Sequence, residues 1–205
     1  MGTGLASFLG PWTVMMAAMM LPSAVPMIRL HRLGADGGLK REVWSGVFIA
    51  GYLAVWAAIG IVVWGAAIAT ESLIMPDQRA FAVAGLLAVA GIYQFTPLKS
   101  ACLRACRTPA DFLVSHWHGG LAGQLRLGVE HGLYCVGCCW ALMAIFVGIG
   151  AMSIPWAVAI AAVVLVEKVL PQGVTFGRAL GVILIGAAIF VLLRPDLVPA
   201  MPEEM

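Results

Sequence analysis

Long apolar runs constrain the fold of this chain more than any other feature of its sequence. Each run is near the ~20 residues that a helix needs to cross about 30 Å of hydrocarbon, although the third and fifth are short. Lipid offers no hydrogen-bond partner to the backbone, so runs this apolar are satisfied only as helices. Six membrane helices are therefore predicted, at Leu5–Met27, Val43–Ala69, Phe81–Thr96, Leu133–Met152, Ile154–Leu170 and Val174–Leu193.

The composition agrees with this all-α membrane fold. Hydrophobic residues make up 62% of the chain and charged residues only 11%, whereas about a quarter of the residues in a soluble domain are charged. The lipid bilayer is thus the expected surroundings. A net charge of +2, with the basic residues scattered over short loops, excludes a nucleic-acid partner. We find no repeat, no soluble segment and no removable signal peptide, so residues 1–205 are expected to form a single integral membrane domain.

The lysines and arginines predict the orientation of the bundle. Basic residues favour the cytoplasmic side of a membrane, and here Arg79 and Arg194 are the two that lie on the opposite side from the rest. Both termini are therefore expected on the non-cytoplasmic side, which in a bacterial inner membrane is the periplasm. The ten residues on the expected cytoplasmic side are Arg29, Arg32, Lys40, Arg41, Lys99, Arg104, Arg107, Arg126, Lys168 and Arg178.

A cluster of soft metal ligands lies in the fourth apolar run. At about 100° per residue, His131, Cys135 and Cys138 share an arc of about 60° on one helix face, and Cys139 lies beside it. Thiolate and imidazole suit Cu(I) or Zn(II) better than Mg²⁺ or Ca²⁺, and ionisable groups within a membrane indicate function. These four residues are predicted to bind a metal. The alternative is that the cysteines only pack, as small hydrophobes.

Methionines form a second candidate ligand group in the first apolar run. Thioethers are neutral ligands suited to Cu(I), and the four side chains span roughly 140° of the helix, although methionine is also an ordinary packing residue. Under the predicted topology they lie about 10–18 Å from the cytoplasmic end of their helix, and the cysteines about 7–15 Å from the same face. The two groups are thus expected to share one layer. The methionines are Met15, Met16, Met19 and Met20.

A cysteine pair, Cys102 and Cys106, lies one helical turn apart near the cytoplasmic end of the third helix. Such a pair can ligate one ion, and the neighbouring basic residues favour thiolates. We expect either a point where the metal enters or leaves the protein, or two inert thiols. A disulfide is disfavoured in the reducing cytoplasm.

The remaining polar residues of the helix ends have weaker predictions. His31, between two arginines, is expected at the surface, and His116 and His118 at the membrane interface or in solvent. Glu167 and Lys168 are expected to form a gate or a proton-linked pair, with the alternative that Lys168 reaches out to the headgroups.

These landmarks together resemble the predicted metal-binding integral membrane protein family, whose described members act as membrane copper chaperones for copper enzymes such as a bacterial tyrosinase. The resemblance covers most of the chain, although His118 is not part of the family pattern. It implies copper binding and a copper-enzyme client. The motifs that carry it are Met15-Met-Ala-Ala-Met-Met-Leu-Pro22 with Pro26, Pro97-Leu-Lys99, Cys102-Leu-Arg-Ala-Cys106-Arg-Thr-Pro109, His116-Trp117, His131-Gly-Leu-Tyr-Cys-Val-Gly-Cys-Cys-Trp-Ala-Leu-Met143 and Glu167-Lys168-Val-Leu-Pro171.

The predicted function is therefore that of a non-enzymatic membrane protein that binds Cu(I), with Zn(II) as the alternative metal, and delivers or transports it for a copper enzyme. A soluble copper chaperone is a second expected partner, and the sequence leaves an oligomer open. One alternative is a thiol–disulfide oxidoreductase that uses the Cys135-x-x-Cys138 spacing. The other is a non-catalytic accessory subunit of a membrane complex. No catalytic triad, phosphate-binding loop or haem-attachment motif is present.

Overall fold

The computed structural model describes residues 4–34, 37–73, 78–148 and 154–195, and within these ranges helices joined by short turns and connections are the only regular secondary structure. The prediction of an all-α protein is confirmed. The helices are α1 (Leu5–Leu33), α2 (Leu39–Leu73), α3 (Arg79–Tyr93), α4 (Pro97–Arg107), α5 (Pro109–His116), α6 (Gly120–Gly148), α7 (Ile154–Val169) and α8 (Gly173–Leu193).

Four of these helices are long and apolar enough to cross a membrane: α1, α2, α6 and α8. A fifth crossing is formed if α3 and α4, which meet at an angle of 64°, make one broken span. Helix α7 has 16 residues, which gives about 24 Å at 1.5 Å per residue and is shorter than the hydrocarbon core. The membrane character is supported, whereas the count of six spans stays a prediction.

The polar stretch Lys99–Gly128, between the third and fourth predicted membrane helices, is itself mostly helical. It holds α4, α5 and the start of α6. Thr96 caps α4 by accepting a hydrogen bond from the Lys99 amide, with Pro97 at the first helical position. Helix α6 begins at Gly120, earlier than the predicted start at Leu133. Its first turns are amphipathic, and a search for continuous apolar runs misses such turns.

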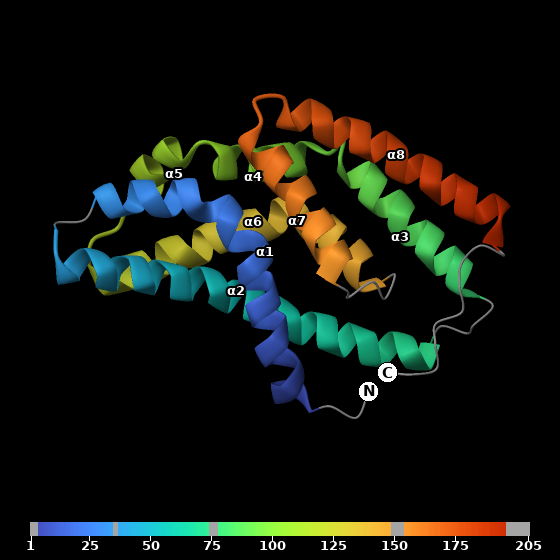
Figure 1. Ribbon diagram of the computed structural model, residues 1–205, viewed down its shortest axis with the longest axis horizontal. Helices are drawn as coiled ribbons and strands as arrows, with labels where there is room; N and C mark the ends of the chain where they lie inside the picture. The colour runs from blue at the N-terminus through green and yellow to red at the C-terminus, as the bar shows by residue number, and fades with distance from the viewer. Residues whose placement is uncertain (1–3, 35–36, 74–77, 149–153, 196–205) are drawn as a thin grey trace.

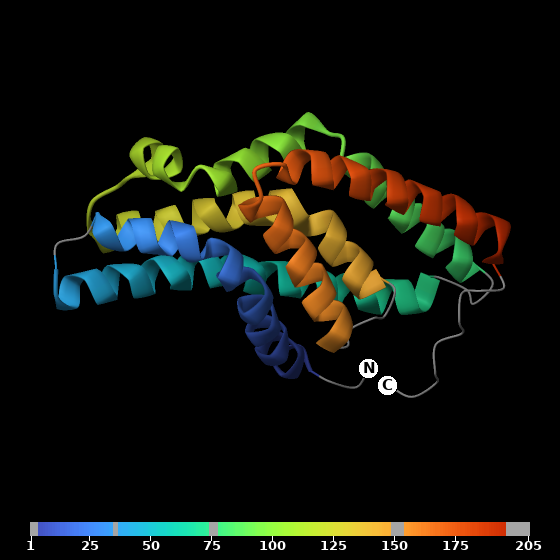
Figure 2. The same cartoon turned by 45° about the horizontal axis from the view of Figure 1, so that its top comes forward.

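Small residues let the helices approach each other closely. Helices α2 and α6 lie side by side and run in the same direction (Figures 1 and 2). A Cβ at Gly51 of α2 would lie 2.5 Å from the carbonyl oxygen of Leu125 in α6, so the glycine is needed at this crossing. Helices α3 and α8 form a second pair, in which a Cβ at Gly91 would lie 2.9 Å from the carbonyl oxygen of Gly181.

Helix α1 changes direction part-way along its length (Figure 1). Pro22 and Pro26 lie inside it, and proline bends a helix because it removes a backbone donor and clashes with the preceding turn. The bend lets α1 contact α2, α5 and α7. The main core cluster of the protein lies where α1, α2, α4, α6 and α7 meet.

Candidate functional site

The main core cluster gathers all five cysteines of the chain. Four of them are buried members of the cluster, and Cys106 is partly buried and packs against it. All five are free thiols. We call this set the thiol core: Cys102 and Cys106 from α4, and Cys135, Cys138 and Cys139 from α6.

The bend between α3 and α4 brings the two α4 cysteines onto α6. Cys102 packs directly over Gly137, where an added Cβ would lie 2.6 Å from the Cys102 Sγ. The hydroxyl of Tyr93 donates a hydrogen bond to the Gly137 carbonyl oxygen at 2.5 Å. Cys106 lies within interaction range of Cys138. The α4 pair, expected as a separate point of metal entrance or exit, is thus in direct contact with the α6 cysteines.

Hydrogen bonds orient the three α6 thiols. The Sγ atoms of Cys138 and Cys139 donate to the carbonyl oxygen of Cys135 at 3.1 and 3.0 Å. The Cys135 Sγ lies 3.0 Å from the Tyr52 hydroxyl and 3.0 Å from the Lys168 Nζ. Cys135 is therefore the thiol with the most polar surroundings, because a hydroxyl and an ammonium group from two other helices contact its sulfur.

Methionines of α1 form another wall of the same cluster. Met16, Met19 and Met20 are buried members, and Met15 is half-buried and packs against them. Met143 from α6 is a further buried member that the sequence did not single out. Thiols and thioethers from three helices therefore belong to one packed cluster of the core.

His131 lies one helical turn before Cys135 but has aromatic neighbours. The ring centroids of Phe112, Tyr52 and Phe48 are 5.3, 5.9 and 6.0 Å from that of the imidazole. The His131 side chain is 2% exposed, and its Nδ1 has no hydrogen-bond partner in the protein. His131 thus lies at the edge of the thiol core, and its role as a metal ligand stays a prediction.

Among the residues that the structure describes, no three histidine, cysteine, aspartate or glutamate side chains are arranged to hold a metal ion. The hydrogen bonds of Cys138 and Cys139 explain part of this, because both thiols point back toward their own helix. Binding an ion between several sulfurs requires these thiols to rotate away from the Cys135 carbonyl. Cysteine χ1 has other staggered positions, and thiols that adopt them would offer the sulfur ligands that a soft metal such as Cu(I) prefers.

A comparison with protein families identifies the chain. The model of the PpoB2 family, described as copper chaperones, matches residues 9–191. The chain belongs to this family. No curated protein and no solved structure matches it significantly. Membership confirms the family resemblance seen in the sequence, and it confirms the expectation of a non-enzyme, since a copper chaperone carries metal without making or breaking covalent bonds of a substrate.

Lys168 of this copper chaperone turns inward rather than toward the headgroups. Its Nζ donates to the Ser23 Oγ at 3.0 Å and to the Cys135 Sγ at 3.0 Å, and the residue is 7% exposed. Ser23 in turn donates to the carbonyl oxygen of Met20 at 2.8 Å. The snorkelling alternative is wrong because the bend of α1 offers the ammonium group a polar partner inside the bundle.

Glu167 does not pair with Lys168, as the sequence suggested, but with Lys99 of α4. The Lys99 Nζ lies 2.8 and 2.9 Å from the two carboxylate oxygens, and both side chains are buried. Arg107 adds hydrogen bonds to the carbonyl oxygens of Glu167 and Pro171 at 3.0 and 2.9 Å. We call Lys99, Arg107 and Glu167 the α4–α7 clamp, since they hold the helix that carries Cys102 and Cys106.

Sequence reasoning missed Ser23 and Tyr52, which complete the polar surroundings of Cys135 and Lys168. A signal existed for Ser23, which lies between Pro22 and Pro26 at the point where α1 loses backbone hydrogen bonds. No signal existed for Tyr52, because its approach to Cys135 depends on the glycine crossing of α2 and α6.

Proposed function

We propose that this protein binds Cu(I) in the thiol core and delivers it to a copper enzyme. The observation that carries the proposal is that every cysteine in the chain belongs to or packs against one core cluster, together with five methionines. Thiolates and thioethers are the soft ligands that Cu(I) prefers. The proposed ligands are Cys102, Cys106, Cys135, Cys138 and Cys139, with Met15, Met16, Met19 and Met20 as the thioether wall and His131 at the edge.

The thioether wall favours copper over zinc. Zn(II) is held by cysteine, histidine and carboxylate groups in tetrahedral sites, and methionine is not among its usual ligands. Thioethers are also weaker ligands than thiolates, which suits a carrier that must release its metal. We therefore propose a soluble copper chaperone as donor and a copper enzyme as client.

The proposed topology places both termini on the non-cytoplasmic side of a bacterial inner membrane, with α7 as a short sixth crossing. The parallel course of α2 and α6 supports one part of this topology, a single crossing made by α3 and α4 between them, because helices separated by one further crossing run the same way (Figure 1). A reporter fused after Met205 should report the periplasm, and one inserted near Asp36 the cytoplasm. The reverse pattern contradicts this topology.

Removal of two α6 thiols tests the binding function. The variant Cys135→Ser with Cys138→Ser, purified in detergent under reducing, anaerobic conditions, should lose stoichiometric Cu(I) binding in competition with a coloured Cu(I) chelator. Ala141→Ser is the matched control, because it also buries a hydroxyl on α6 but faces a separate cluster with Ala90 and Tyr93. Full copper binding by the double variant would contradict the proposal and favour an accessory role for the protein.

A further inference from the structure

Two buried histidines lie in line between the surface and the thiol core. His31 of α1, expected at the surface, is 0% exposed, and His131 of α6 is also buried. The ring of Phe48 lies between them, with centroids 5.0 Å from His31 and 6.0 Å from His131. Both imidazoles carry an Nδ1 atom without a hydrogen-bond partner in the protein.

A hydrogen-bond chain fixes which nitrogen of His31 carries the proton. The Gln124 Nε2 donates to the carbonyl oxygen of His118 at 2.8 Å, so the Gln124 Oε1 is the atom that faces His31. That oxygen can only accept a hydrogen bond, and the His31 Nε2 lies 2.6 Å from it. The proton of the neutral ring is therefore on Nε2, and Nδ1 presents a bare lone pair.

A bare imidazole nitrogen that is buried without a partner loses its hydration and gains no hydrogen bond, which costs free energy. A partner that fixes the other ring nitrogen is the arrangement by which proteins prepare a histidine to bind metal. Imidazole is a suitable ligand for copper. The chain from His118 through Gln124 thus holds His31 in a state that can accept a soft cation.

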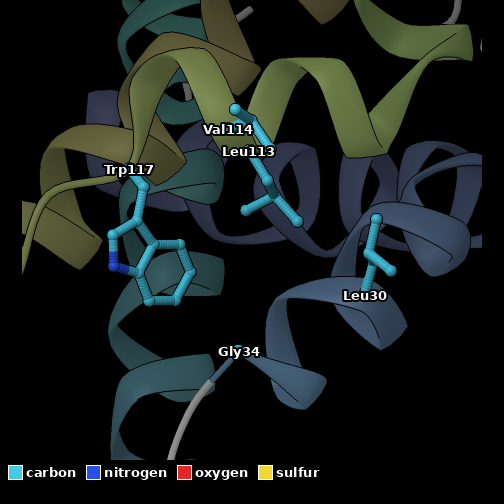
Figure 3. Close-up of a pocket in the computed structure, with 5 residues that line it drawn as sticks. All are labelled: Leu30, Gly34, Leu113, Val114 and Trp117. Carbon is cyan, nitrogen blue, oxygen red and sulfur yellow. The ribbon is translucent and has the colours of Figure 1, made fainter.

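The outer end of this line reaches an open pocket between the end of α1 and α5. It is lined by Leu30, Gly34, Leu113, Val114 and Trp117 (Figure 3). The Trp117 ring contacts His31, with centroids 5.7 Å apart.

The inner end reaches the thiol core. Tyr52 contacts the His131 ring at 5.9 Å, and its hydroxyl bonds to the Cys135 Sγ at 3.0 Å. The line therefore runs from Trp117 through His31, Phe48 and His131 to Cys135.

We propose that His31 and His131 form a two-imidazole path along which Cu(I) passes between the pocket beside α5 and the thiol core. The ion binds at the Nδ1 lone pair of His31 without any redox change and displaces no proton from that ring. His31 stacks on Phe48 with an interplanar angle of 25°, and the Phe48 ring contacts His131, so the two imidazoles are linked through this ring. The path rests on the proposed Cu(I) function and adds the route by which the metal reaches the thiols.

Uptake kinetics test the path. Rates of Cu(I) transfer from a coloured chelator complex to the detergent-purified protein should fall about tenfold in His31→Phe, with the final copper stoichiometry unchanged. Phenylalanine keeps the aromatic contacts to Phe48 and Trp117. The matched control is His116→Phe, which should transfer at the wild-type rate, because the His116 Nδ1 already bonds to Ser115 and the Phe112 carbonyl. Wild-type uptake by His31→Phe would overturn the path while leaving the thiol site in place.

A second measurement uses only the wild-type protein, so it does not depend on whether a variant folds. Wild-type protein with ¹⁵N-labelled histidine is titrated with Ag(I), a soft monovalent probe of the same charge as Cu(I). The Nδ1 resonances of His31 and His131 should shift while that of His116 stays. Thiol binding of Ag(I) with no change at His31 would overturn the path, whereas failure of the wild type to bind either ion would instead contradict the proposed function.

Discussion

The α4–α7 clamp and the thiol core lie side by side, and one buried lysine belongs to the first while another contacts the second. Lys99 of the clamp faces the two oxygens of a carboxylate, so its charge is matched by a fixed opposite charge. Lys168, which contacts the thiol core, faces a hydroxyl and a thiol instead. The clamp is thus complete without any ligand, whereas the thiol core keeps groups that a metal can still engage.

Helix α7 therefore contributes one charged residue to a structural ion pair and another to the surroundings of the proposed metal site. Glu167 and Lys168 are neighbours on α7, yet the first points to α4 and the second to α1 and α6. A buried ion pair is destabilising to break because the remaining charge has no water. We therefore expect changes in the clamp to alter stability, and changes in the thiol core to alter copper affinity.

The largest effect is expected from breaking the clamp. Glu167→Gln leaves Lys99 buried without its opposite charge, which should lower the free energy of unfolding by about 3–5 kcal/mol. The measurement is denaturant or thermal unfolding in detergent. The control is Glu42→Gln in the exposed pair with Arg32, where the loss should stay below about 1 kcal/mol. A Glu167→Gln variant as stable as the wild type would show that the clamp does not support the fold.

A smaller effect, on copper and not on stability, is expected from the methionine wall. Substitution of Met16, Met19 and Met20 by leucine conserves volume, so each change should cost less than about 1.5 kcal/mol of stability. Copper affinity should fall by about 10–100-fold, the usual loss when a supporting group of a metal site is removed. Met27→Leu is the matched control on the same helix, because Met27 packs in a separate cluster with Phe48 and Leu127. Equal affinities for both variants would leave the methionines as packing residues.

The smallest effect is expected from Tyr52→Phe. The substitution removes one hydrogen bond to the Cys135 sulfur, and a hydrogen bond contributes about 1 kcal/mol, which corresponds to about fivefold in Cu(I) affinity. Tyr134→Phe serves as control, because the Tyr134 ring packs against Phe112 and His116. An unchanged affinity in Tyr52→Phe would mean that the hydroxyl does not support the metal-bound sulfur.

Much of the fold can be predicted from the sequence, because the backbone of an apolar run in lipid satisfies its hydrogen bonds only as a helix. All six runs contain a helix of the structure, and the Cys135–Cys139 ligand group lies in the core. The helical spacing of Cys102 and Cys106 was expected as the end of the third helix and not as a separate helix α4, and α5 was missed, since its polarity resembles that of a loop. The packing of α4 against α6 could not be predicted from the sequence either. It depends on the 64° bend before Pro97, which brings Cys102 and Cys106 onto α6.

His31 shows why a local pattern misleads at a helix end. Its arginine neighbours suggested a surface position, yet Met27 and His31, one turn apart, are both buried. Charged residues on either side of a position in a helix point in other directions, so they say little about the residue between them. The four-residue spacing from Met27 to His31 indicates that both residues lie on the same buried face of the helix. The hydrogen bond between His31 and Gln124 is seen only in the structure.

The central claim is that the α1 methionines and the α6 thiols serve one ion. A double-mutant cycle between Cys139→Ser and the Met16, Met19 and Met20 leucine variant tests it most directly, with Cu(I) affinity as the readout. Groups that bind one ion should be coupled, so the combined loss should depart from the sum of the separate losses by at least about 0.5 kcal/mol. Strict additivity, with each variant lowering affinity independently, would contradict a shared site.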